Sequence, residues 1–231
     1  MVRRVAALIS LLGFAACNGA MNGDRVREQY HRSIYAGLSP LVTITNVAGA
    51  VRIEGWSNQA IDVAATKYGY DAADVHGIAI DFDASQEGLI AIKTRYDHGV
   101  HGGGVRYLVH VPPLASVQIS NTAGMVEVVG VRGDVTVKTQ AGEITVNAGP
   151  VGGNRSIDLT ATTGAVNLSM ASSSSATVQA SSTIGDITSD FPNVTVRREN
   201  LVGARGGGTI GSGDAHVVVR TTTGAITLRQ R

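Results

Sequence analysis

The chain of 231 residues has little cysteine, few aromatic residues, few prolines and little charge. Its single cysteine excludes an intramolecular disulfide, so no disulfide framework holds the fold together. A charged fraction of 16% and a net charge of +1 lack the basic excess of nucleic-acid-binding proteins, and Arg197-Arg198 and Arg229 to Arg231 are the only dense basic spots. What remains is rich in glycine, with 29 copies, and in β-branched residues. This composition indicates a folded all-β domain with no nucleic-acid partner.

Many of these glycines begin a recurring phrase: a glycine, a spacer, a β-branched residue, another spacer and usually a second aliphatic residue. Successive glycines of the later copies lie 18, 22, 21 and 39 residues apart, and the last gap predicts two steps with one degenerate copy. Such a period is typical of an array of one supersecondary unit. The turn glycines of the copies are Gly49, Gly124, Gly142, Gly164, Gly185 and Gly224.

Strict alternation of apolar and polar residues between the glycines predicts strands with one buried face. The residues expected to point inward are Val126, Val128, Val135, Val137, Ile144 and Val146, with Val166, Ile187 and Ile226 at the equivalent places of later copies. Their neighbours Glu127, Thr136 and Thr145 should face water. In a stack of copies, each inward residue should contact its equivalents in the adjoining copies.

The turns between these strands favour one of two topologies. Four of the five residues three positions before the later glycines can hydrogen-bond turn backbone, and each glycine supplies a positive φ at no steric cost. The residue just before the glycine is alanine, threonine or isoleucine, whereas two-residue hairpins prefer asparagine or aspartate there. We therefore expect a β-solenoid of stacked, roughly 20-residue coils. An antiparallel meander with a similar period stays open.

The N-terminal half has longer strands separated by ordinary turns. We expect residues 28–115 to form an antiparallel, sandwich-like portion that covers the first coil, and residues 116–231 to form the regular repeats. Together they make a single β-strand-repeat domain, 28–231.

The first 27 residues have a different character. Arg3 and Arg4 precede an apolar run that is too short to span a bilayer and that ends in two alanines and Cys17, which predicts a signal peptide over 1–17 and a tether over 18–27. Residues 14–17 resemble a bacterial lipobox, with Phe14 where leucine is usual. The resemblance implies lipidation of Cys17 and a membrane-anchored protein of the cell envelope, at the outer membrane in a Gram-negative organism. Ordinary cleavage after an alanine, giving a soluble periplasmic or secreted protein, stays open.

Three stretches together resemble a known family. They are Gly49 to Trp56, Tyr107 to Pro112, and the glycine-rich ending from Gly206 to Ile226. Over residues 28–231 this pattern is similar to the bacterial putative-adhesin family of β-strand-repeat proteins, domain of unknown function 4097. The resemblance implies a repeat fold, and the family offers no catalytic residues to carry over.

Histidines and carboxylates gather in three places, which we weigh as metal or catalytic sites. Asp97, His98 and His101 could hold zinc, but a glycine-flanked loop is also where exposed histidines are harmless. Two further sets, Asp71, Asp74 and His76, and Asp81 with Asp83, could supply the paired carboxylates of glycoside hydrolysis. A solvated turn and a solvated strand face are the better interpretations, and we expect no metal.

Two other patterns match functional motifs by letter. Gly206, Gly208 and Gly211 fit the dinucleotide fingerprint, but no helix follows them and Ser212 lacks a nucleophile elbow, so we expect no cofactor. Outward threonines invite an ice- or sugar-binding interpretation, but they alternate with charged residues, so a plain polar sheet face is favoured. These threonines are Thr136, Thr145, Thr177, Thr188, Thr195 and Thr227.

The sequence thus favours a non-enzymatic, envelope-anchored repeat scaffold, an adhesin or interaction protein whose partner is an unidentified macromolecule. The alternative is a polysaccharide-acting enzyme on a β-helix. That enzyme would need carboxylates from adjacent coils to meet in one groove, so the two hypotheses differ in an observable way.

Overall fold

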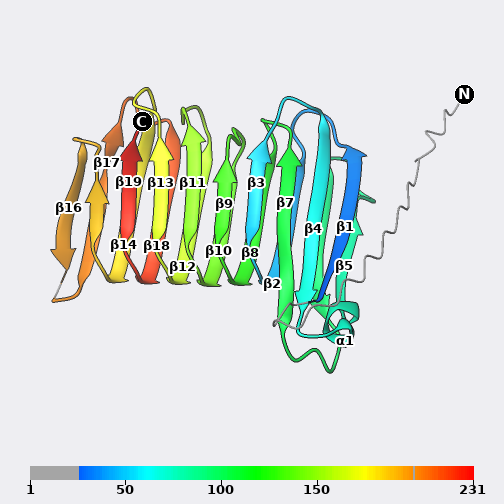
Figure 1. Cartoon of the computed structure of the whole chain (residues 1–231). Helices are drawn as coiled ribbons and strands as arrows, with labels where there is room; N and C mark the ends of the chain where they lie inside the picture. The colour runs from blue at the N-terminus through cyan, green and yellow to red at the C-terminus, as the bar shows by residue number, and fades with distance from the viewer. Residues whose placement is uncertain (1–25, 200) are drawn as a thin grey trace, which may run out of the picture.

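The computed structural model describes residues 26–199 and 201–231, which form two long β-sheets and one short helix, α1 (Ala72–His76) (Figure 1). Among these residues no helix has the length and apolar character needed to cross a membrane. The predicted signal peptide, Cys17 and all but the last two residues of the expected tether lie outside the described residues. The all-β prediction is confirmed.

Sheet A has nine strands. In spatial order they are β1 (Val26–Tyr35), β4 (Ala60–Gly69), β7 (Gly103–Val111), β3 (Val51–Gly55), β9 (Val126–Val129), β11 (Ile144–Gly149), β13 (Val166–Met170), β19 (Ile226–Gln230) and β15 (Ile187–Ser189).

Sheet B has ten strands and faces sheet A across the core. In spatial order they are β16 (Val194–Glu199), β17 (Gly203–Ile210), β14 (Ala176–Ile184), β18 (Ala215–Thr223), β12 (Ser156–Thr163), β10 (Val135–Ala141), β8 (Ser116–Ala123), β2 (Leu41–Ala48), β6 (Leu89–Tyr96) and β5 (Ile78–Asp83).

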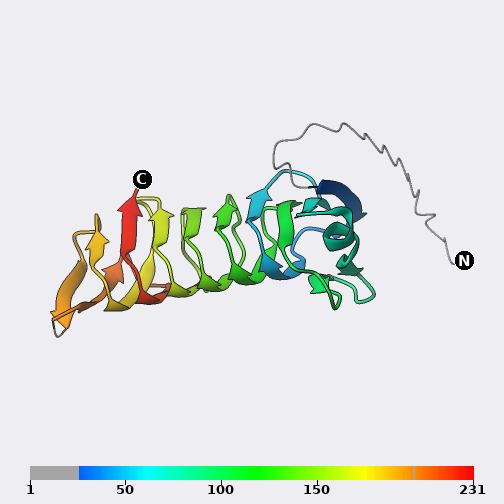
Figure 2. The ribbon, with the colours of Figure 1, turned by 60° about the horizontal axis from the view of Figure 1, so that its bottom comes forward.

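Each coil of the repeat contributes one strand to sheet B, turns at the glycine, and contributes the next strand to sheet A; Figure 2 shows the coils as successive rungs. Neighbouring coils pair in parallel and in register, so that Ile144 lies opposite Val126 on one side and Val166 on the other. Parallel pairing confirms the solenoid and excludes the meander, because consecutive strands of a meander would pair antiparallel.

The coils do not stack in the order of the sequence. The last coil, β18 and β19, lies between the coil of β12 and β13 and the coil of β14 and β15. Val166 therefore pairs with Ile226, and Ile226 with Ile187. Stacking in sequence order, which would place Ile187 beside Val166, does not occur, because the chain leaves the stack after β15 and returns to fill the space between the two coils. Accordingly, the C-terminus in Figure 1 lies beside β19 and not at the end of the stack.

The degenerate repeat predicted between Gly185 and Gly224 is also wrong. That segment forms strands β16 and β17, an antiparallel hairpin that pairs with β14 and extends sheet B past the coil of β14 and β15. The hairpin adds strands to sheet B alone and therefore ends the stack. A further coil would instead expose a new edge strand ready to pair with another coil.

The opposite end of the stack is capped in a similar way. Antiparallel pairs join β1, β4 and β7 in sheet A, and β5 and β6 in sheet B, in line with the expected N-terminal portion. Strands β2 and β3 fall within residues 28–115 but are already a coil, because they pair in parallel with β8 and β9. The regular stack thus begins earlier than residue 116.

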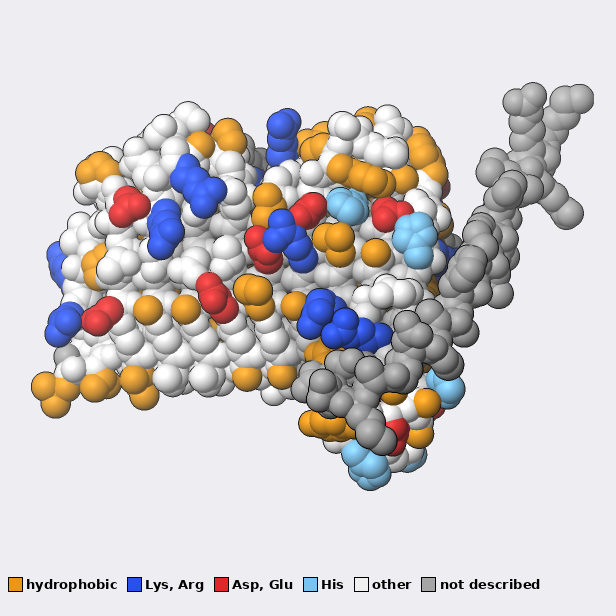
Figure 3. Space-filling view, in the orientation of Figure 1, with side chains coloured by type: hydrophobic (Ala, Val, Ile, Leu, Met, Phe, Trp, Pro, Cys, Tyr) orange, Lys and Arg blue, Asp and Glu red, His pale blue; other side chains and the backbone are white. Residues whose placement is uncertain are grey.

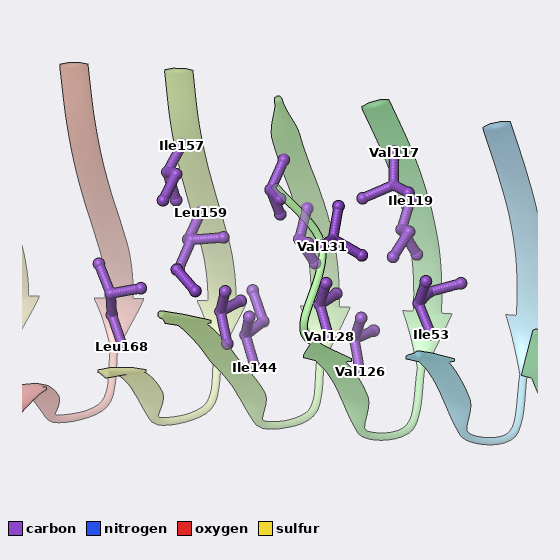
Figure 4. Packing of buried hydrophobic residues seen from close by; sticks show 14 of the residues in the cluster. Ile53, Val117, Ile119, Val126, Val128, Val131, Ile144, Ile157, Leu159 and Leu168 are labelled. Carbon is purple, nitrogen blue, oxygen red and sulfur yellow. The ribbon is translucent and has the colours of Figure 1, made fainter. Parts of the chain in front are cut away.

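The core lies between the two sheets (Figure 4). All nine residues predicted to point inward are buried, whereas Glu127, Thr136 and Thr145 keep exposed surface. The sequence therefore predicted correctly which face of each strand is buried.

The six turn glycines form a ladder along one corner of the stack. All have positive φ, from 114° at Gly49 to 151° at Gly224. At each, a Cβ would collide with a backbone carbonyl of the adjoining coil or, at Gly49, of β7; at Gly142 it would meet the oxygen of Gly124, and at Gly164 the oxygen of Gly142. Glycine is thus required twice, by the conformation and by the close approach of neighbouring backbones.

Polar side chains fix this corner from inside. Asn46 and Asn121 are buried, and the Asn46 Nδ2 donates to Asn121 Oδ1 at 3.1 Å while Asn121 Nδ2 donates to the Gly124 oxygen at 3.0 Å. Thr94 donates to Asn46 and contacts the buried Tyr107 hydroxyl, whose pKa is raised to about 12 by burial. Hydrogen-bonded polar groups of this kind specify the register of the coils.

The opposite corner is held by a buried cation, Arg155. Its guanidinium donates to the oxygens of Gly133 at 2.8 Å and Val131 at 2.6 Å, in the connection between β9 and β10, and to the oxygen of Ala148 near the end of β11 at 3.2 Å. Burial lowers the pKa of this guanidinium, and Asp134 partly opposes the effect. Arginine suits this place because its fork of donors can satisfy several carbonyls at once.

Candidate functional site

The three residues weighed as a metal site lie apart from any group of ligands. Asp97, His98 and His101 lie in the loop between β6 and β7, and no group of three potential ligands comes together among the described residues. His101 instead contributes its backbone, whose N–H donates to Asp74 Oδ1 at 2.9 Å.

The second acidic set, around α1, is structural. Asp71 is the N-cap of α1, and its Oδ1 accepts from the Asp74 N–H at 2.8 Å. Asp74 is buried and also accepts from the Tyr70 N–H. Its pKa is lowered, first by the hydrogen bond from His101, so the carboxylate stays ionised and ties the helix to the following loop.

The carboxylates of the third set, on β5, also have hydrogen-bond partners. Asp81 accepts two hydrogen bonds from Arg95 on the neighbouring strand, and Asp83 accepts from the Ser85 N–H at 2.9 Å. These contacts lower the pKa of both carboxyls. Neither can be the protonated acid that glycoside hydrolysis requires near neutral pH.

The glycine fingerprint and the outward threonines lie at places that do not suit the functions of those motifs. Gly206 and Gly208 lie within β17, an internal strand of sheet B, and Gly211 in the turn to β18, so no helix N-terminus meets a phosphate here. Ser212 bonds Ser175 and Asp214 on the surface. The six outward threonines belong to both sheets and form no single array.

A different cluster appears on the outer face of sheet A, over the first two coils and the N-terminal cap. We call it the charged row. Figure 3 looks onto this face and shows acidic, basic and histidine side chains alternating across neighbouring strands. The row runs over five adjacent strands and consists of His31 of β1, Asp62 of β4, His110 of β7, Glu54 and Arg52 of β3, and Glu127 of β9.

Contacts run the length of the charged row. Arg52 lies at its centre, with Nε 2.5 Å from Glu54 Oε1 and Nη1 2.5 Å from Glu127 Oε2. On the other side of Glu54, its second oxygen lies 3.3 Å from His110 Nε2. Asp62 pairs with His31 at 2.9 Å. Each carboxylate of the row therefore contacts a cation or a histidine ring.

Trp56 orders the middle of the row. Its ring stacks on His110 with centroids 5.1 Å apart, and its Nε1 donates to the Ala60 oxygen at 2.8 Å. The His110 Nδ1 is buried, has no hydrogen-bond partner, and lies 3.9 Å from an Asp62 oxygen. The stacking thus holds the histidine ring between the carboxylates of Glu54 and Asp62.

A hollow of about 480 Å³ adjoins the charged row, and we call it the sheet A hollow. Arg52, Glu54 and Glu127 lie at its polar side, and most of its surface is apolar. Leu108, 36% exposed, and Met125, 46% exposed, form part of this apolar lining. Apolar side chains uncovered beside a polar rim are typical of a contact surface.

The charged row bears on the enzyme alternative, since Glu54 and Glu127 come from adjacent coils and line one hollow. Arg52 bridges them, however, and its hydrogen bond lowers the pKa of Glu54 in spite of partial burial. A general acid must carry a proton near neutral pH. Glu54 is therefore unsuited to that role, and the pair is a salt-bridge network.

Sequence reasoning missed this site because its members are dispersed between residues 31 and 127, and only the strand order brings them together. One signal was present: Arg52, Glu54 and Trp56 alternate on one strand face and its extension, where the later copies of the repeat carry mostly small polar residues.

The fold and the site define a class of protein: a parallel β-solenoid of two sheets, capped by antiparallel strands at both ends, with a largely apolar hollow on its outer face. The Toastrack family, DUF4097, matches residues 113–229, which is half of the chain, and the protein belongs to this family. The resemblance inferred from the sequence is confirmed.

The chain is similar to solved structures. One is a putative cell adhesion protein from Clostridium sporogenes ATCC 15579, with a TM-score of 0.66 at 11% identity over 90% of this chain and 100% of that chain. A putative adhesin from Bacteroides fragilis NCTC 9343 gives a TM-score of 0.33 at 11% identity over 87% and 97%. No curated protein matches the sequence. At this identity the first likeness shows a shared fold alone.

Proposed function

We propose that the protein is a non-enzymatic repeat scaffold, anchored in the cell envelope, that contacts another macromolecule through the sheet A hollow. The observation that supports a contact surface is that Leu108 and Met125 are exposed beside the charged row, whose charges are already paired with one another. Such a surface offers apolar area to a partner without leaving a buried charge unpaired. The description of the Clostridium sporogenes protein as a putative cell adhesion protein agrees with an adhesive role.

The anchor in this proposal is Cys17, with its lipobox-like context. Diacylation of the cysteine would hold the solenoid at a membrane, since more than one acyl chain gives stable attachment. We propose the outer membrane as the destination in a Gram-negative organism. The residue after Cys17 is Asn18, whereas an aspartate at this position would resemble an inner-membrane retention signal.

One experiment tests both parts, by fractionation and chemical cross-linking of intact cells that produce the full chain. Wild type should enter the membrane fraction, incorporate radiolabelled palmitate and give a cross-linked adduct of higher mass. Cys17→Ser should lose the label and leave the membrane fraction. Leu108→Thr with Met125→Ser should keep the label and the membrane fraction but lose most of the adduct, because the apolar contact area is removed.

The matched control changes two other exposed apolar residues, Val47→Thr and Leu114→Ser, which lie outside the hollow. This control should cross-link like wild type. Unchanged labelling and fractionation of Cys17→Ser would refute the anchor and favour a soluble periplasmic or secreted protein. Equal adducts from the hollow variant and its control would refute the contact surface.

A further inference from the structure

The outer face of sheet B carries a line of cations that we call the basic row. Its members are Arg197 of β16, Arg205 of β17, Arg220 of β18, Lys138 of β10 and Lys93 of β6. They are distant in sequence but share one register position: Arg197 pairs with Arg205, and the line continues through Ser181 to Arg220, through Thr160 to Lys138, and through Ser120 and Thr45 to Lys93. Only hydroxyl side chains separate the cations.

Two hollows lie on this face beside the basic row. One, of about 450 Å³, lies between Arg205 and Arg220 and includes Gln179 and Ser181. Gly206 of β17 also lines this hollow. The second hollow, of about 190 Å³, is lined by Lys138 together with hydroxyl and amide groups of β2, β8 and β10. Cations and neutral hydrogen-bonding groups therefore surround both hollows.

The cations of the basic row are available to a ligand. Arg205 is 70% exposed and pairs with Glu199, and Arg220 is 52% exposed and lies 3.7 Å from Asp158. Exposed pairs of this kind contribute little and exchange readily for another anion. Among the described residues, Arg197 and Lys138 have no carboxylate within ion-pair distance. This face differs from sheet A, where Arg52 is shared by two carboxylates.

The spacing of the row indicates the shape of the ligand. Adjacent strands lie about 4.8 Å apart, so Arg205 and Arg220, and likewise Arg220 and Lys138, are separated by about 10 Å along the stack. One hydroxyl side chain lies between the cations of each pair, Ser181 in the first and Thr160 in the second. An extended polymer with an acidic group on every second unit and hydroxyls on the others has this alternation.

We propose that the outer face of sheet B binds an acidic polysaccharide, whose chain crosses the strands and places its carboxylates on the basic row. Arginine and lysine hold the carboxylates, and the serine, threonine and glutamine side chains hydrogen-bond the sugar hydroxyls. A single-stranded nucleic acid fits less well, because its bases need aromatic platforms and, among the described residues, no aromatic side chain lies in the basic row. This site is separate from the contact proposed at the sheet A hollow.

The test measures binding of the full chain carrying Cys17→Ser to hyaluronan, in which every second sugar is a uronate, with neutral dextran and poly-dT as comparison ligands. Hyaluronan should bind and weaken as salt rises, and dextran should not bind. Arg205→Gln with Arg220→Gln should weaken hyaluronan binding about tenfold or more. The matched control, Arg106→Gln with Arg229→Gln, removes the same charge from other positions and should bind like the parent.

Circular dichroism of both double variants checks that the fold is intact; because all four arginines are exposed, both should fold. Binding to dextran, equal losses in the two double variants, or tighter binding to poly-dT than to hyaluronan would each overturn the proposal. Cross-linking through the sheet A hollow is read separately, in cells, so failure here leaves that result unaffected. Loss of hyaluronan binding only in the Arg205 and Arg220 variant supports the site.

Discussion

Replacing Gly142 with alanine should destabilise the fold by about 3 kcal/mol or more, because two costs combine at this position. Gly142 has φ 147°, where an L side chain is strained by about 1–3 kcal/mol. Its Cβ would also collide with the backbone oxygen of Gly124 in the adjoining coil, and overpacking against backbone costs a further 1–3 kcal/mol, roughly. Thermal or urea unfolding of the purified protein measures the effect.

Two other glycines separate the costs. Gly149 also has positive φ, 62°, but a Cβ there meets open space, so Gly149→Ala should cost about 1 kcal/mol. Gly152 has neither constraint, and Gly152→Ala should be neutral or slightly stabilising, since alanine restricts the unfolded chain. Midpoints in the order Gly142, Gly149, Gly152 from least to most stable are expected. Equal midpoints for the Gly142 and Gly149 variants would contradict the close approach of the coils.

The second large effect is expected at Ile144, which is buried between β9 and β13. Ile144→Asp places an unpaired carboxylate in the apolar interior, and the cost should be several kcal/mol, about 4 or more. Each coil is supported only by its neighbours, so the loss should extend to the contacts with Val126 and Val166. The variant should unfold at a much lower temperature or fail to accumulate.

Thr145→Asn is the matched control on the adjacent, outward position. Thr145 donates to Glu143 at 3.1 Å and lies opposite Glu127, so a second carboxylate would add repulsion that asparagine avoids. The control should change stability by less than about 0.5 kcal/mol. Equal melting temperatures for the two variants would contradict the assignment of Ile144 to the inward face and Thr145 to the outward face of β11.

Local features of the fold could be predicted from the sequence. The alternation around Val126 and Ile144 states which face is buried, and the turn glycines state where the chain reverses, because both depend on neighbours within a few residues. The N-cap of α1 was also readable, since an acidic residue three positions after Asp71 is a known start signal. It was missed because the acidic residues were weighed as a catalytic set and then interpreted as a solvated turn, and not as a helix start.

The stacking order could not be predicted in this way. Every copy of the repeat presents the same face, so the period is equally compatible with sequential stacking and with the observed insertion of β18 and β19. The basic row depends on this insertion and on strand register, which place Arg220 between Ser181 and Thr160, and the charged row depends on the strand order at the other end of sheet A. Apart from the Arg197-Arg198 pair, the sequence shows the cations of the basic row as isolated charges, which is why a net charge of +1 suggested no anion-binding face.

The order of the coils is tested most directly by pairs of cysteines on the outer face of sheet B, in a Cys17→Ser chain that has no other thiol. The paired residues on either side of these positions place Thr162 opposite Thr222, and Thr222 opposite Thr183. Each of these pairs is therefore about 4.8 Å apart and within disulfide range. Thr162 and Thr183 lie two strands apart, at about 10 Å, beyond that range. Mild oxidation followed by mass spectrometry should show a disulfide in Thr162→Cys with Thr222→Cys and two free thiols in Thr162→Cys with Thr183→Cys. The reverse result would mean that the coils stack in sequence order and would contradict the fold described above.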